Sequence, residues 1–283
     1  MTTVAQTGPA PALAAARARL GLIGVLFALA ALCWWWTADR MTGMDAGPGT
    51  PPGALGWFVG VWVVMMAAMM LPSVAPTVAL HARMTRTGGG WASAAFTAGY
   101  LLTWSAAGVL AYGVYVLGRE LLGSELAWDG AGHWVAGGTL LLAGAYELTP
   151  LKDACLSKCR SPLGFLLGRW RDGVRGALGM GVRHGAWCLG CCWALMASLF
   201  ALGVMSIAAM AFVAAIIAFE KTLPWHRAAT WTTAGVLIVL GVLLIAAPEA
   251  IPGLTVPGDE TMGMPDDAMG MPDDAMQDGM GMP

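Results

Sequence analysis

Charged side chains are scarce in this chain. Only 11% of its 283 residues are charged, whereas soluble domains carry about 25%. Hydrophobic residues make up 58%, and they come in long runs rather than in amphipathic stripes. The shortage of charge excludes an ordinary soluble domain, and the long runs predict a polytopic membrane protein.

Other absences narrow the function. The formal net charge is -2, so the basic excess expected of a nucleic-acid-binding protein is missing. The six cysteines lie mostly in or beside apolar segments, unlike the disulfide framework of a small secreted domain. Neither a P-loop nor an Asp-Lys-Thr-Gly phosphorylation motif occurs, so any transport is secondary or driven by a partner.

The apolar runs predict an all-α, polytopic membrane helix bundle of about seven transmembrane helices. The expected spans cover approximately residues 20–38, 56–80, 92–118, 132–150, 180–202, 204–222 and 230–248. The first span lacks a signal-peptide cleavage site. The fifth and sixth together are too long for one crossing of about 30 Å, so a tight turn is expected near Gly203. Residues 151–179 are expected along the cytoplasmic interface, as a short helix broken near Pro162.

Basic residues alternate between the loops and predict the topology. They precede span one, follow span two, and lie between spans four and five and between six and seven: Arg17, Arg19, Arg83, Arg86, Lys152, Lys158, Arg160, Arg169, Arg171, Arg175, Arg183, Lys221 and Arg227. This pattern predicts the N-terminus inside and the C-terminus outside a bacterial inner (cytoplasmic) membrane. The expected organisation is a disordered N-terminal extension (1–18), a transmembrane helical domain (19–250) and a disordered extracytoplasmic tail (251–283).

The fifth span carries the densest set of potential metal ligands. On an α-helix, His184, Cys188 and Cys191 fall within an arc of about 60°, with Cys192 beside it and Met196 at its edge. Thiolate and imidazole are ligands that Cu(I) and Zn(II) prefer. Two other readings stay open: close helix packing by small residues, and thiol–disulfide exchange by the Cys-x-x-Cys pair, for which no thioredoxin-like context is present.

A second thiol pair lies in the segment before the fifth span. Cys155 and Cys159 are four residues apart, so on a helix both point the same way. The basic neighbours Lys152, Lys158 and Arg160 are expected to favour the thiolate form. The topology places this pair at the same membrane face as His184. Together with the fifth span, the pair could complete a three- or four-coordinate soft-metal site.

Methionines and acids suggest further ligands. The second span contains four methionines in six residues, followed by two helix-kinking prolines. It is a candidate thioether pathway or simple core filling, and its methionines are Met65, Met66, Met69 and Met70. Glu147 ends span four and Glu220 ends span six. Both are candidate ligands near the cytoplasmic face, or each belongs to a Glu–Lys pair at a helix end.

The C-terminal tail repeats the unit Met-Gly-Met-Pro three times. Proline, glycine and aspartate prevent a packed core, but a solvated tail has no need of methionine. Paired thioethers suit Cu(I) where external conditions would oxidise thiols. The alternative is a low-complexity expansion without function. The candidate ligands in the tail are Met262, Met264, Met269, Met271, Met280 and Met282.

These motifs resemble a bacterial family of predicted metal-binding integral membrane proteins, a domain of unknown function. The resemblance covers roughly residues 55–245. It rests on Met-Met-Ala-Ala-Met-Met-Leu-Pro from Met65, Tyr-Glu-Leu-Thr-Pro-Leu-Lys from Tyr146, Cys-x-x-x-Cys-Arg-x-Pro from Cys155, Gly-x-x-Cys-x-Gly-Cys-Cys-Trp from Gly185, and Glu220-Lys221. The resemblance implies metal binding and names no reaction.

The favoured hypothesis is a copper-binding membrane protein that holds or moves Cu(I) across or within the membrane. Copper is the expected metal and zinc the alternative, because the ligands are soft. Its expected partners are membrane lipid and either a metallochaperone or a periplasmic metalloprotein, without nucleic acid. Two alternatives stay open: a membrane thiol oxidoreductase that uses Cys188 and Cys191 with Cys155 and Cys159, and a non-catalytic accessory subunit of a membrane complex.

Overall fold

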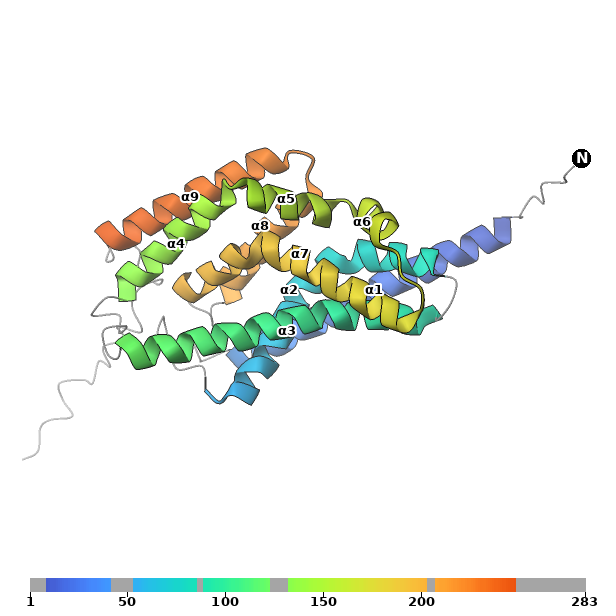
Figure 1. The fold of residues 1–283 in the computed structure, drawn as a ribbon, viewed down its shortest axis with the longest axis horizontal. Coiled ribbons are helices and arrows are strands. Elements are labelled where there is room, and N and C mark those ends of the chain that lie inside the picture. The colour runs from blue at the N-terminus through green and yellow to red at the C-terminus, as the bar shows by residue number, and fades with distance from the viewer. Residues whose placement is uncertain (1–8, 42–52, 86–88, 123–131, 203–206, 248–283) are drawn as a thin grey trace, which may run out of the picture.

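The computed structural model describes residues 9–41, 53–85, 89–122, 132–202 and 207–247, and these form nine helices without a strand (Figure 1). In chain order the helices are α1 (Pro9–Met41), α2 (Leu55–Met84), α3 (Gly89–Leu122), α4 (His133–Glu147), α5 (Pro150–Arg160), α6 (Pro162–Arg169), α7 (Gly173–Leu202), α8 (Ile207–Thr222) and α9 (His226–Ala246). The predicted all-helical class is thereby confirmed for the described residues.

Each of the seven predicted spans falls on a helix of its own: α1, α2, α3, α4, α7, α8 or α9. In the part of the chain that the structure describes, four helical segments are long and apolar enough to cross a membrane, namely Arg19–Arg40, Leu55–Met84, Gly90–Leu121 and Arg227–Ala246. Insertion into a membrane is consistent with these segments. The number of seven spans and their orientation remain predictions.

The helix boundaries refine the expected organisation. The helix is interrupted between α5 and α6 at Ser161. Pro162, which has no amide N–H, begins the new helix. The first helix starts at Pro9, so residues 9–18 of the predicted disordered extension are helical; this stretch is rich in alanine, the strongest helix former. Helix α7, which contains the fifth expected span, starts at Gly173, before the predicted start of that span at residue 180. Gly203 and the tail lie outside the described residues.

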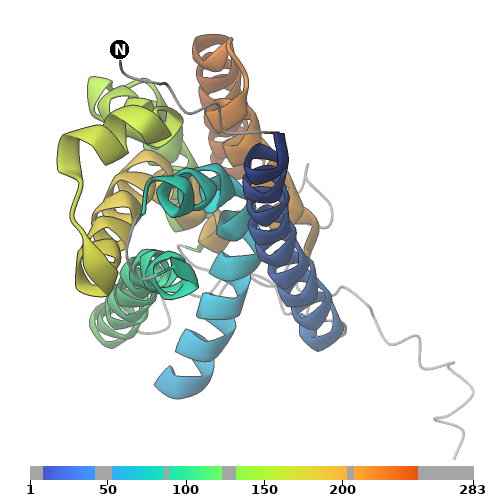
Figure 2. The same cartoon turned by 90° about the vertical axis from the view of Figure 1, so that its right-hand side faces the viewer.

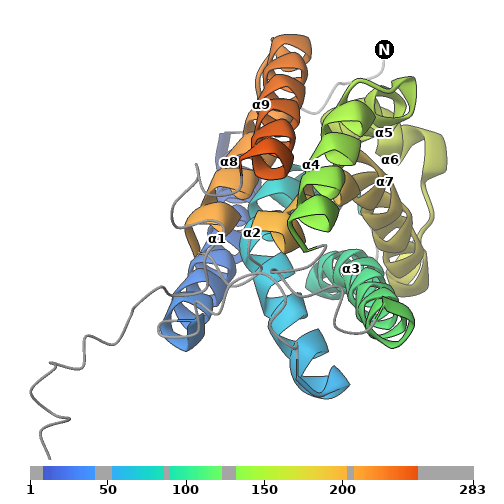
Figure 3. The ribbon, with the colours of Figure 1, turned by 90° about the vertical axis from the view of Figure 1, so that its left-hand side faces the viewer.

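Close helix pairs build the bundle. Helix α1 lies on the outside against α2 (Figure 2), and α4 runs beside α9 (Figure 3). Helix α3 packs along α7, where a side chain on Gly181 would collide with the backbone oxygen of Phe96 and one on Gly99 with that of Leu178. Small residues that let two backbones touch are typical of membrane helix pairs. This contact fixes the side of α7 that faces α3.

Candidate metal centre

Three thiols from two helices converge in the core. Cys159 of α5 and Cys188 and Cys191 of α7 place their Sγ atoms within 4.8 Å of one another, and the Cys191 and Cys159 sulfurs are 3.7 Å apart. A metal ion in the plane of three sulfurs, about 2.3 Å from each, needs them about 4.0 Å apart. Cys188 and Cys191 are buried and Cys159 is half-buried. The three thiols therefore fit a three-coordinate soft-metal ion.

Helix α5 is anchored so that its cysteines face α7. Thr149 caps its N-terminus by accepting a hydrogen bond from the Lys152 amide, and Pro150 occupies the first turn. The missing side chain of Gly190 makes room for Cys155, since a Cβ there would lie 2.8 Å from the Cys155 Sγ. The hydroxyl of Tyr146 donates to the carbonyl of the same glycine at 2.6 Å. The approach of α5 to α7 thus depends on a glycine within the cysteine motif.

The thiols of α5 differ from the sequence-based expectation. Burial raises the pKa of Cys155, and contacts with the Cys188 and Cys191 thiols, followed by burial, raise the pKa of Cys159 well above its usual range. Both directions oppose the thiolate form that the basic neighbours were expected to favour. The reason is that the basic neighbours point elsewhere: Lys152 pairs with carboxylates and Arg160 donates to the carbonyl of Glu220.

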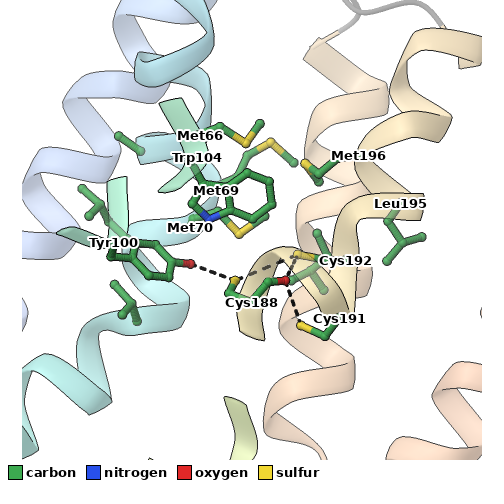
Figure 4. Packing of buried hydrophobic residues seen from close by; sticks show 14 of the residues in the cluster. Met66, Met69, Met70, Tyr100, Trp104, Cys188, Cys191, Cys192, Leu195 and Met196 are labelled. Carbon is green, nitrogen blue, oxygen red and sulfur yellow. Dashed lines mark hydrogen bonds between the residues drawn. The ribbon is translucent and has the colours of Figure 1, made fainter. Parts of the chain in front are cut away.

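Cys188 of α7 contacts polar side chains from two further helices, α3 and α8. Its Sγ lies 2.9 Å from the Tyr100 hydroxyl of α3 and 3.1 Å from the Lys221 Nζ of α8. The same ammonium donates to Ser73 Oγ of α2 at 3.2 Å. Figure 4 shows the tyrosine hydroxyl directed at Cys188. Sequence reasoning did not single out Tyr100 or Lys221 as site residues, because these contacts join positions 88 and 33 residues apart.

A family model described as PpoB2, copper chaperone, matches residues 59–244. The chain belongs to this copper chaperone family. No curated protein and no solved structure matches it. The matched range contains all three converging thiols and the contacts of Cys188, so the cysteine cluster belongs to the part of the chain that the copper chaperone family shares.

The remaining thiol of α7 lies beside the cluster. Cys192 is 4.0 Å from Cys188, sulfur to sulfur, and donates to the carbonyl of Cys188 at 2.8 Å. It is not one of the three thiols that lie within 4.8 Å of one another. All six cysteines are free. In this copper chaperone family member, Cys192 is therefore a neighbour of the candidate site rather than one of its three converging ligands.

His184 is buried one turn before Cys188, among aromatic rings. The ring of Phe165 meets it edge-on with centroids 4.9 Å apart, and those of Phe96 and Tyr100 lie at 6.0 Å. Its Nδ1 is buried without a hydrogen-bond partner. The imidazole does not join the group of three thiols. A role for His184 as a metal ligand remains a prediction.

The predicted acids share one lysine. Lys152 of α5 forms ion pairs with Glu147 of α4 and Glu220 of α8, and all three residues are buried. Burial lowers the pKa of the Lys152 ammonium, and Glu220 opposes that change. Glu147 thus belongs to a Glu–Lys pair at a helix end, as the alternative expected, whereas Glu220 of α8 pairs with the lysine of another helix. The arrangement ties three helices of the copper chaperone fold together beside the thiols.

The methionines of the second span are buried, as core residues and candidate ligands both require. Figure 4 shows Met66, Met69 and Met70 of α2 gathered with Met196 of α7 near Cys188. Met65 is buried in the same core. The tail methionines lie outside the described residues. These thioethers and the thiols of α7 thus belong to one buried cluster, within the range that the copper chaperone family model covers.

Proposed function

We propose that this protein is a membrane-embedded copper chaperone that holds Cu(I) between the thiols of Cys159, Cys188 and Cys191. The observation that carries the proposal is the convergence of these three sulfurs in a chain that belongs to a copper chaperone family. Thiolates are soft ligands that select Cu(I) over hard cations. Holding copper and exchanging it with a partner requires no nucleotide hydrolysis, which agrees with the lack of P-loop and phosphorylation motifs in the sequence.

The exposure of the three thiols suggests how copper enters and leaves. Cys188 and Cys191 are 1% exposed, whereas Cys159 at the end of α5 is half-buried. A partner that exchanges ligands one at a time therefore meets Cys159 first. We propose a cytosolic metallochaperone or a periplasmic metalloprotein as that partner. In the proposed topology of seven spans, with the N-terminus inside a bacterial inner membrane, α5 faces the cytosol.

The thioethers supply the proposed continuation of this path. Met66, Met69, Met70 and Met196 share one buried cluster with the thiols of α7 (Figure 4), and Met65 is buried in the same core. Thioethers bind Cu(I) more weakly than thiolates do, because a thioether is neutral and a thiolate is negatively charged. A group of weakly binding thioethers near tightly binding thiolates suits a protein that must release its copper again. The tail methionines would receive copper on the outer side.

The test is the copper content of the anaerobically purified protein. After Cu(I) loading and removal of excess metal, the wild type is expected to retain copper, and Cys188→Ser is expected to lose it. Cys33→Ser serves as the matched control, because Cys33 lies in α1 away from the three-thiol group. A wild type that stays metal-free under these conditions contradicts the proposal.

One distance favours a second candidate, a thiol oxidoreductase. The Cys159 and Cys191 sulfurs are 3.7 Å apart, so a small movement toward the disulfide distance of about 2.05 Å would join them. This function predicts a Cys159–Cys191 disulfide after mild oxidation, mixed disulfides with a partner, and no bound metal. Alkylation followed by mass spectrometry distinguishes it from copper binding.

A further inference from the structure

The ammonium group of Lys221 sits at the edge of the three-thiol cluster. Its Nζ is 3.1 Å from Cys188 Sγ and 3.2 Å from Ser73 Oγ. Within the described residues it forms no ion pair with a carboxylate, because the adjacent Glu220 is paired with Lys152. The positive charge of Lys221 therefore faces the sulfur of a candidate ligand.

The surrounding contacts hold this charge in place. The hydroxyl of Ser73 donates to the carbonyl of Met70 at 3.0 Å, which leaves its oxygen free to accept from Lys221. Lys221 lies at the end of α8 and Ser73 in α2, so the ammonium bridges two helices at Cys188. A charge held from two sides can stay beside the cluster after a metal ion has bound to the sulfurs.

We propose that Lys221 sets the metal selectivity of the cluster and favours Cu(I) over Zn(II). The proposal rests on the proposed function, because it assumes that the three thiols bind metal. Three thiolates with Cu(I) carry two net negative charges (three minus one). The same thiolates with Zn(II) carry one (three minus two). A fixed positive charge stabilises the more negative complex more strongly.

The metal-free state does not enter this comparison. Both metals bind to the same protein at the same pH, so the metal-free state cancels in the ratio of the two affinities. The two metal complexes then differ by one unit of charge, located a few ångströms from the Lys221 ammonium. In a site from which water is largely excluded, such a difference is expected to change the Cu(I)/Zn(II) affinity ratio by about tenfold or more.

The experiment measures both affinities on the full-length protein in detergent. A chromogenic Cu(I) chelator under anaerobic conditions and a Zn(II) indicator dye provide the two competitions. Lys221→Gln and Lys221→Met remove the charge and are expected to lower the Cu(I)/Zn(II) ratio by about tenfold or more. Lys221→Arg keeps the charge and is expected to restore most of the ratio. Lys158→Gln is the matched control, since Lys158 is exposed on α5 beside Cys159.

The outcomes separate this inference from the proposed function. An unchanged ratio in the neutral variants, with copper still bound, overturns the role of Lys221 and leaves the copper site intact. Loss of all metal from the wild type overturns the proposed function instead. If neither neutral variant folds, Ser73→Ala decides, because it removes one of the two contacts that hold the ammonium beside Cys188. The Cu(I)/Zn(II) affinity ratio of this variant is then expected to fall, by less than in the neutral variants, and an unchanged ratio contradicts the proposal.

Discussion

At the scale of single residues, two adjacent cysteines of α7 have different surroundings. Cys191 reaches across to Cys159 of α5, while Cys192 contacts Cys188 within its own helix. Neighbouring positions on a helix point about 100° apart, so only one of them can face α5. Substitutions of Cys191 and of Cys192 can therefore be compared directly, because both are buried cysteines of the same helix.

Replacement of Cys191 is expected to matter more than replacement of Cys192. Cys191→Ala removes a ligand from the three-thiol group and is expected to weaken Cu(I) binding at least about tenfold, as loss of a direct ligand does. Cys192→Ala is expected to change the affinity by less than about threefold, because the three-thiol group stays complete. Competition with a Cu(I) chelator measures both. Equal losses in the two variants would show that Cys192 is a ligand too.

Lys152 is the residue on which two buried carboxylates depend. Glu147 and Glu220 lose their common cation in Lys152→Met, and unpaired buried charges cost about 3–5 kcal/mol. We expect a marked fall in thermal stability in detergent. Copper binding is then expected to be lost through unfolding, although all three thiols are still present. The triple variant with Glu147→Gln and Glu220→Gln is expected to recover much of the stability, because no charge is left unpaired. A stable single variant contradicts this account of the triad.

At the scale of helices, the position of the cysteines depends on how closely α7 approaches α3. Gly181 contacts the backbone of Phe96, and a Cβ on Gly185 would lie 2.8 Å from Thr103 Oγ1. Tyr100 lies between these contact points in α3 and reaches Cys188 at 2.9 Å. Wider spacing of the helices would therefore pull the tyrosine hydroxyl away from the thiol.

Two glycines of α7 test this dependence. Gly181→Ala places a methyl group against the backbone oxygen of Phe96, so we expect a loss of about 1–3 kcal/mol in stability and weaker copper binding. Gly179→Ala is the control, because a Cβ there meets nothing within 4 Å and alanine favours helix by about 1 kcal/mol. Melting temperatures in detergent compare the two. Equal effects would mean that close packing at Gly181 is unimportant.

The helices were more predictable than the contacts between them. The apolar runs predicted every long helix, and Pro162 predicted the break between α5 and α6, because both signals are local. Helical periodicity alone predicted that Cys188 and Cys191 lie on one side of α7. Lys221 could not be assigned to Cys188 in this way, since that contact depends on how α8 packs on α7. Lys152 was expected at the membrane interface as a basic marker of topology, and only the fold shows it buried between two acids.

At the scale of the whole molecule, orientation decides which compartment exchanges copper with which ligand. The alternation of basic loops predicts the C-terminus outside and α5 at the cytosolic face. Reporter fusions test this directly. Alkaline phosphatase fused after residue 250 is expected to be active, and the same fusion after Arg160 is expected to be inactive, because the enzyme folds only in an oxidising compartment. Activity in the reverse order would invert the proposed path.

The methionine-rich tail is expected to add capacity rather than to build the main site. Deletion of residues 258–283 is expected to lower the total Cu(I) bound at saturation and to leave the tightest copper in place, because neutral thioethers bind more weakly than thiolates. Titration of the full-length and truncated proteins, with elemental analysis, measures both quantities. Loss of the tightest copper on truncation would move the main site into the tail.

The three thiols come from two helices that α6 separates in the chain, so in the proposed function copper would act as a cross-link. A metal ion on Cys159, Cys188 and Cys191 joins α5 to α7, and the unfolded chain cannot hold those sulfurs together. By linkage, free copper at a hundred times its dissociation constant would stabilise the fold by about 2.7 kcal/mol. Delivery of copper would then loosen the contact between α5 and α7, so the loaded and the emptied protein would differ in rigidity at the face where the proposed partner docks.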